Sequence, residues 1–151
     1  DKKFQWENLF LVCPHCNNTK LGNEDEILDC TNPSHKIYDW IEYKFTSFPK
    51  TKVELKIINN IDIVNNTVTL LDKIYNGSTV NKKFEADNIK KKIMREIQSF
   101  ENLIFEYVYN SKKELVEEIK EKLSRKSAFS AFKRWIIKNN TRYKELEKYF
   151  D

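Results

Sequence analysis

Glycine and proline are scarce in this chain, which has two glycines and three prolines among 151 residues. Few residues are therefore available for tight turns, and this favours helices joined by short connections. No apolar run approaches the ~20 residues that a membrane-spanning helix requires. We expect a mostly helical protein with no membrane partner.

Cysteine and histidine are also rare, with three and two residues respectively. Two of the cysteines, Cys13 and Cys16, form a Cys-x-x-Cys pair. Such a pair suits metal binding in a reducing compartment better than a disulfide framework. No secretory leader precedes Asp1. These features together predict a cytoplasmic protein.

The overall composition is that of a folded, mildly basic protein. Hydrophobic residues make up 40% of the chain and aromatic residues 13%, enough for a packed core. At this length the core belongs to one domain, or to one domain with a small appendage. The formal net charge of +4 permits contact with nucleic acid but does not require it, because a local patch matters more than the sum.

The spacing of apolar residues changes along the chain from irregular to helical. Residues 37–45 are rich in aromatic and β-branched residues and are predicted as a strand that pairs with residues 53–58. Helices are predicted over 65–75, 84–109, 115–123, 128–138 and 141–149, with Ser111, Ser127 and Thr141 as N-caps and Asn76-Gly77 as a stop. The predicted fold class is α+β and mostly helical, with a small module over residues 1–50 and a helical body over residues 51–151.

The Cys-x-x-Cys pair lies in the segment with the most chemical information. Two thiolates two residues apart can hold one metal ion from a tight turn, but they supply only half of a tetrahedral zinc site. Asn17 follows directly after Cys16 and opens a polar segment. Its amide oxygen is a suitable ligand for a hard cation.

The run from Asn8 to Lys20, NLFLVCPHCNNTK, resembles the C-terminal half of the HNH endonuclease motif. In that family a ββα-metal hairpin and helix hold one catalytic divalent ion, and a structural zinc often joins two Cys-x-x-Cys knuckles. The fold that this resemblance implies is a partial ββα-metal module ahead of the helical body. Residues 28–31, 39–42, 74–77 and 127–137 are similar to a prokaryotic HNH subgroup, the Septu and retron-associated antiphage effectors.

The resemblance implies a role for each matching residue. Asn8 would brace the loop of the ββα element, and Asn17 would ligate the catalytic Mg²⁺ or another divalent cation. Cys13 and Cys16 would form the second knuckle of the structural Zn²⁺ site. Lys20 stands where a basic residue meets a phosphate of a DNA or RNA substrate. The resembled effectors also imply a partner ATPase of the ABC/SMC-like type that docks on the helical region.

The chain departs from the family's pattern ahead of Asn8. An HNH enzyme needs an upstream histidine as general base, and the seven residues before Asn8 contain neither histidine nor cysteine. We expect that half of the motif to lie in a preceding segment, with a degenerate protein as the alternative. The intact enzyme would hydrolyse a phosphodiester by metal-assisted attack of water. The chain by itself is expected to be inactive.

Both histidines leave alternatives open. His15, between the two thiolates, is expected to point to solvent, as a contact for nucleic acid or as a substitute base. Cys30 and His35 complete the pattern Cys-x₂-Cys-x₁₃-Cys-x₄-His, which is acceptable spacing for a self-contained zinc site. The alternative makes Cys30 a small buried apolar residue and His35 a surface residue.

The helical body offers two basic segments. Lysines at 82–83 and 90–92, with Arg95, form either a solvated face or a phosphate track. Lys133 and Arg134 precede Trp135 on a segment whose aromatic residues are expected to pack inward. The second function class left open is a non-catalytic zinc-knuckle adaptor that binds nucleic acid or a protein partner.

Overall fold

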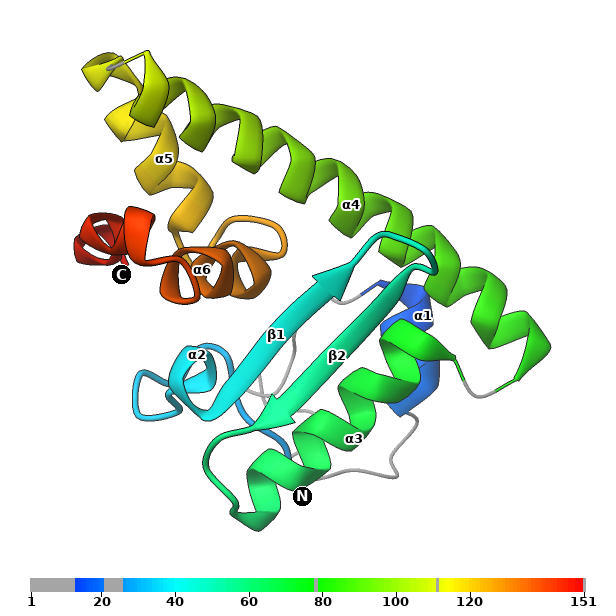
Figure 1. Cartoon of the computed structure of the whole chain (residues 1–151). Helices are drawn as coiled ribbons and strands as arrows, with labels where there is room; N and C mark the ends of the chain where they lie inside the picture. The colour runs from blue at the N-terminus through cyan, green and yellow to red at the C-terminus, as the bar shows by residue number, and fades with distance from the viewer. Residues whose placement is uncertain (1–12, 21–25, 78, 111, 151) are drawn as a thin grey trace.

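The computed structural model describes residues 13–20, 26–77, 79–110 and 112–150, and in them helices surround one small sheet (Figure 1). The elements in order are α1 (Pro14–Lys20), α2 (Ile37–Trp40), β1 (Ile41–Thr46), β2 (Lys52–Ile57), α3 (Asp62–Asn76), α4 (Val80–Tyr109), the 3₁₀ helix η3 (Lys113–Leu115), α5 (Val116–Leu123), α6 (Ser130–Lys138) and the 3₁₀ helix η4 (Thr141–Tyr149). The predicted class, α+β and mostly helical, is confirmed. No helix in these ranges is long and apolar enough to cross a membrane.

The two strands form an antiparallel hairpin with Tyr43 opposite Leu55 and Phe45 opposite Val53. Alternate side chains are buried, as expected for a sheet with one covered face, and Ile41, Tyr43 and Val53 belong to the core. In Figure 1 helix α3 lies along β2, while α6 packs against β1. The predicted pairing of the two apolar segments is thus confirmed.

The first strand begins later than predicted. Residues 37–40 form the single turn α2, because the carbonyl of Lys36 accepts hydrogen bonds from the backbone N–H groups of Asp39 and Trp40, both at 2.9 Å. The extended segment therefore starts at Ile41, and the prediction of a strand from residue 37 is wrong. Aromatic and β-branched residues here serve core packing rather than strand formation.

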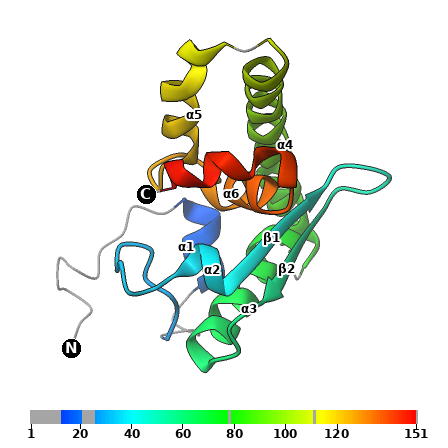
Figure 2. The same ribbon diagram turned by 60° about the vertical axis from the view of Figure 1, so that its left-hand side comes forward.

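Two hydrophobic cores share helices α4 and α6. The first lies under the hairpin, and its buried members are Leu28, Ile41, Tyr43, Val53, Val64, Ile93, Ile97 and Phe132. The second lies where α5 folds back along the C-terminal half of α4, as Figure 2 shows, and contains Phe100, Leu103, Ile104, Ile119, Leu123, Ile137 and Leu146. The division expected at residue 50 falls in the turn of the hairpin, and the first core draws residues from both sides of it.

Helix ends agree with the sequence only in part. Helix α3 ends at Gly77, whose φ of 70° is left-handed, so the predicted Asn76-Gly77 stop is confirmed. Helix α4 starts four residues earlier than predicted, because Thr79 caps it by accepting a hydrogen bond from the N–H of Lys82 at 3.3 Å. Ser111, the predicted cap of the next helix, lies outside the described residues.

The two C-terminal helices are capped differently from prediction. Helix α6 starts at Ser130, after Phe129 in the left-handed region at φ 53°, so the prediction that Ser127 caps it is wrong. The final segment is a 3₁₀ helix capped by Asn140, whose side chain accepts from the N–H of Arg142 at 3.1 Å. Thr141 is its first residue and not its cap.

A buried ion pair joins α4 to α6. Lys133 is fully buried, and its Nζ donates to Glu96 and to the hydroxyl of Ser127, each at 3.0 Å. Burial lowers the pKa of Lys133, and the hydrogen bond from Lys133 lowers the pKa of Glu96 below its ordinary value of 4.5. The Ser127 hydroxyl therefore accepts a hydrogen bond from the buried ammonium of Lys133.

The substitution Glu96→Gln tests this pair. It leaves a buried ammonium without its counter-ion, and we expect a loss of about 2 kcal/mol in the free energy of unfolding, discounted because Glu96 is partly exposed. A carboxylate whose pKa is lowered by folding stabilises the folded state above pH 4.5, and this stabilisation is lost as the pH falls through the folded pKa. The difference in unfolding free energy between the wild type and the variant should therefore disappear below pH 4.5.

Urea unfolding at several pH values measures this effect. The matched control is Glu117→Gln, which removes a carboxylate that pairs with Lys120 at 2.6 Å but is 82% exposed. That change should cost less than about 0.5 kcal/mol. Equal losses in the two variants would show that the buried pair contributes no more than a surface pair.

Candidate metal knuckle and neighbouring lysine cleft

Helix α1 begins directly at the Cys-x-x-Cys pair. Cys13 stands in the N-cap position, where its sulfur accepts a hydrogen bond from the N–H of Cys16 at 3.3 Å. Pro14 occupies the first helical position, which suits its fixed φ and its missing N–H. The carbonyl of Cys13 accepts from the N–H of Asn17 at 3.0 Å, closing the first turn. The sequence Cys-Pro-x-Cys is therefore a helix start that brings both sulfurs to one place.

The two sulfur atoms lie 2.9 Å apart. Cys13 is exposed and Cys16 is half-buried. Burial, followed by the hydrogen bond and the charge of Cys13, raises the pKa of the Cys16 thiol to about 12. The Cys16 thiol therefore keeps its proton at neutral pH, and a bound metal ion would have to displace it.

The pair suits one half of a tetrahedral zinc site. Zinc–sulfur bonds of about 2.3 Å at the tetrahedral angle place two sulfurs about 3.8 Å apart. The observed 2.9 Å needs an opening of about 1 Å, within the reach of side-chain rotation. In the described ranges no group of three or more His, Cys, Asp or Glu side chains comes together to hold a metal ion.

The structure does not bring Cys30 and His35 to the pair. Cys30 is exposed, and the expectation of a small buried residue at this position is wrong. His35 is half-buried, and its Nδ1 accepts a hydrogen bond from the backbone N–H of Asp29 at 2.8 Å. His35 therefore stabilises the turn over residues 29–35, while Cys30 lies on the surface.

The candidate residues of α1 share one face of the helix. Residues 13, 16, 17 and 20 follow the spacing i, i+3, i+4 and i+7, which places them on a single stripe. Asn17 on this stripe is exposed, and Lys20 at its end is half-buried. The opposite face carries His15 and Thr19, which are 8% and 7% exposed. Asn8, the other candidate, lies outside the described residues.

His15 anchors the buried face of α1. Its Nε2 lies 2.9 Å from the carbonyl oxygen of Ile74, and its Nδ1 lies 2.5 Å from Oε2 of Glu85. Each ring nitrogen thus has one oxygen partner, from two different helices. The expectation that His15 points to solvent is wrong, and both of its nitrogens are engaged within the protein.

The carbonyl that His15 contacts lies in the last turn of α3, where backbone acceptors lack partners within the helix. Glu85 lies near the start of α4. His15 thus closes the corner between α3 and α4 while it fixes α1 in place.

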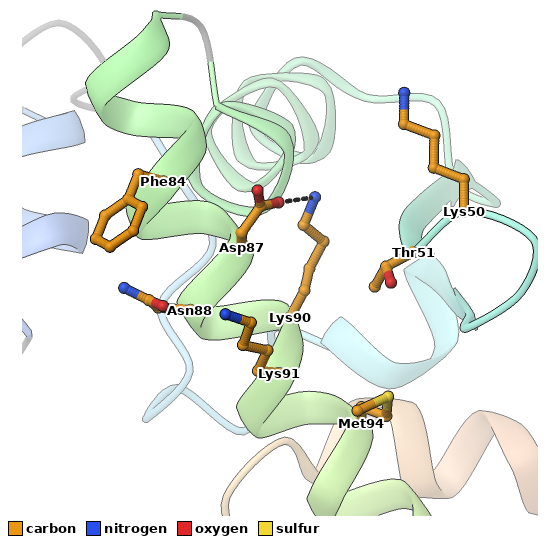
Figure 3. Close-up of a pocket in the computed structure, with 8 residues that line it drawn as sticks. All are labelled: Lys50, Thr51, Phe84, Asp87, Asn88, Lys90, Lys91 and Met94. Carbon is orange, nitrogen blue, oxygen red and sulfur yellow. Dashed lines mark ion pairs between the residues drawn. The ribbon is translucent and has the colours of Figure 1, made fainter.

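A cleft of about 390 Å³ lies between the turn of the hairpin and α4 (Figure 3). Its lining residues are Lys50, Thr51, Phe84, Asp87, Asn88, Lys90, Lys91 and Met94. Of these, only lysines 90 and 91 were predicted from the sequence as part of a basic segment, since nothing in the residue pattern shows which loop faces a helix. The spatial relation of Lys50 and Thr51 to α4 comes from the fold alone.

Comparisons with protein-family models, with curated proteins and with solved structures found no match.

Replacing His15 with alanine tests the anchor. We expect backbone amides of α1 to exchange hydrogen faster and the free energy of unfolding to fall by about 1–3 kcal/mol, because the variant leaves the carbonyl of Ile74 and the carboxylate of Glu85 without this partner. The control Asn18→Ala changes an exposed residue of the same helix and should leave exchange in α3 and α4 unchanged. Hydrogen exchange measured by mass spectrometry distinguishes the two, and equal protection in both variants would contradict the anchoring role.

Proposed function

We propose that this chain supplies the C-terminal half of an HNH-type, metal-dependent endonuclease that hydrolyses phosphodiester bonds of DNA or RNA. The observation that carries the proposal is the stripe on α1. Cys13, Cys16, Asn17 and Lys20 share one helix face, while the other face is fixed by His15. This division separates residues suited to ligand binding from residues that hold the helix.

Each residue of the stripe has a role in the proposal. The paired sulfurs of Cys13 and Cys16 suit one half of a structural zinc site. The exposed amide of Asn17 offers a neutral oxygen for a hard divalent cation, and Lys20 offers an ammonium for a phosphate oxygen. A divalent cation bound there supplies charge stabilisation for the phosphodiester under attack.

The proposal requires a general base from outside the described residues. His15 has both ring nitrogens engaged, and Nδ1 of His35 is taken by the N–H of Asp29. The histidine that activates water, and the second pair of zinc ligands, would therefore come from a segment or chain other than those ranges. Antiphage defence and an ABC/SMC-like ATPase partner for the helical body belong to the proposal through the resemblance alone.

The engagement of both histidines within the fold favours a second candidate function. A chain whose histidines both serve the fold is also suited to act as a non-catalytic adaptor, with the thiol pair as part of a zinc knuckle and the helices as the binding surface. The two functions differ in whether Asn17 matters for phosphodiester cleavage.

Substitution of Asn17 by alanine in the protein expressed from its complete gene tests the enzyme. We expect Mg²⁺-dependent cleavage of DNA or RNA to fall by at least about 10-fold, because even the loss of a second-sphere group at a metal site costs about 10–100-fold. Asn18→Ala is a matched control, since Asn18 is the adjacent, equally exposed asparagine of the same helix. Cleavage is followed on labelled substrate with and without a chelator.

Three outcomes are informative. Loss of cleavage in the Asn17 variant alone supports the enzyme. Equal activity of both variants with wild type removes Asn17 from the metal site. A wild-type protein that binds about one zinc per chain through Cys13 and Cys16, but cleaves neither DNA nor RNA, supports the adaptor.

A further inference from the structure

We propose that the cleft between the hairpin turn and α4 binds single-stranded nucleic acid, with Lys50 and Lys91 contacting phosphates and Phe84 stacking on a base. The inference deepens the proposed function, on which it rests for the class of substrate. Binding in this cleft is measurable without any cleavage, so the two proposals can fail separately.

The cleft carries an excess of positive charge. Its lining holds three lysines and one carboxylate, that of Asp87. Nζ of Lys90 forms an ion pair with Oδ1 of this carboxylate at 2.8 Å, and the Lys90 side chain is only 11% exposed (Figure 3). The hydrogen bond from Lys90 lowers the pKa of Asp87, and the charges of Lys91 and Lys50 add to the effect. The acid is therefore ionised and already neutralised at neutral pH.

Lys50 and Lys91 remain as exposed ammonium groups on opposite sides of this internal pair. Lys50 extends from the hairpin turn and Lys91 from α4, as Figure 3 shows. In the part of the chain that the structure describes, neither has a carboxylate within ion-pair distance. Two exposed ammonium groups that line one cleft without such a partner favour a polyanionic ligand, whose phosphates would replace the counter-ions.

Exposed aromatic residues distinguish nucleic acid from an acidic peptide. Phe84 lines the cleft and is 69% exposed, and Phe48, two residues before Lys50, is 83% exposed. Neither ring serves the core, and a base can stack on such a ring beside a cationic groove. Stacking needs an unpaired base, so the arrangement favours a single strand over a duplex. Asn88 adds an amide that can donate to and accept from a base edge.

The cleft also adjoins the candidate metal knuckle. Glu85, which holds His15 of α1, is the residue after Phe84 and lies one helical turn before Asn88. A strand in the cleft therefore runs along the same segment of α4 that positions α1. The same segment of α4 thus positions the helix whose opposite face carries Cys13, Cys16 and Asn17.

Fluorescence anisotropy with a labelled oligonucleotide of about 12 nucleotides, in the presence of EDTA, tests the cleft. The double variant Lys50→Glu and Lys91→Glu should weaken binding at least about tenfold and reduce the slope of log affinity against log salt by about 1.4, since each single-strand phosphate contact contributes about 0.7. Phe84→Ala should weaken binding about tenfold. All three residues are exposed, so thermal melting should show folded proteins.

The control is Lys144→Glu, which makes the same charge change at an exposed residue of η4, an element that contributes no residue to the lining of the cleft. The loss of affinity per reversed charge should be much smaller in this control than in the cleft variants. The wild type should prefer a single strand over a duplex of equal length, and should bind the oligonucleotide more tightly than polyglutamate of equal charge.

The proposal is overturned in any of three cases. The first is a Lys144 variant that loses as much affinity per charge as the cleft variants. The second is tight duplex binding that Phe84→Ala does not affect. The third is polyglutamate that competes as well as the oligonucleotide, which would assign the cleft to an acidic protein partner. Loss of cleavage in the Asn17 variant with normal binding, or the reverse, separates this proposal from the proposed function.

Discussion

The candidate site depends on one side chain, the imidazole of His15. A helix of seven residues is too short to be stable in water by itself, so α1 needs tertiary contacts to persist. His15 supplies them by linking the carbonyl of Ile74 in the last turn of α3 to the carboxylate of Glu85 in α4. Because this bond network is on one face of α1, the thiols and Asn17 are held on the other face, away from the contacts of His15.

The sequence was informative about the exposed face of α1 and misleading about the buried one. Residue type alone identifies Cys13, Cys16, Asn17 and Lys20 as candidates, whereas their common stripe follows from helix α1, at a place where the sequence predicted only a tight turn. The burial of His15 depends on a carbonyl 59 residues away and a carboxylate 70 residues away, and no local pattern encodes either contact. In a helix that starts at a Cys-x-x-Cys pair, a histidine two residues after the first cysteine falls on the opposite face. Helical periodicity therefore marks such a histidine as a candidate anchor for that helix.

The same distinction explains the helix ends. The stop at Gly77 follows from a local backbone requirement, so sequence reasoning finds it. Ser127 has the right residue type for a cap, but its hydroxyl accepts from the buried ammonium of Lys133, and the chain turns at Phe129 before α6 begins. The need to satisfy a buried charge overrides a local capping preference, and the partner of that charge, Glu96, lies on another helix.

Helix α4 relates the knuckle, the cleft and the helical body to one another. Along α4, Glu85 contacts α1, Lys91 lines the cleft and Glu96 pairs with α6. Glu85 and Lys91 are six residues apart, which is roughly 9 Å along a helix at 1.5 Å per residue. One rigid helix therefore sets the spacing between the residue that holds His15 and the cleft that we propose to bind a single strand.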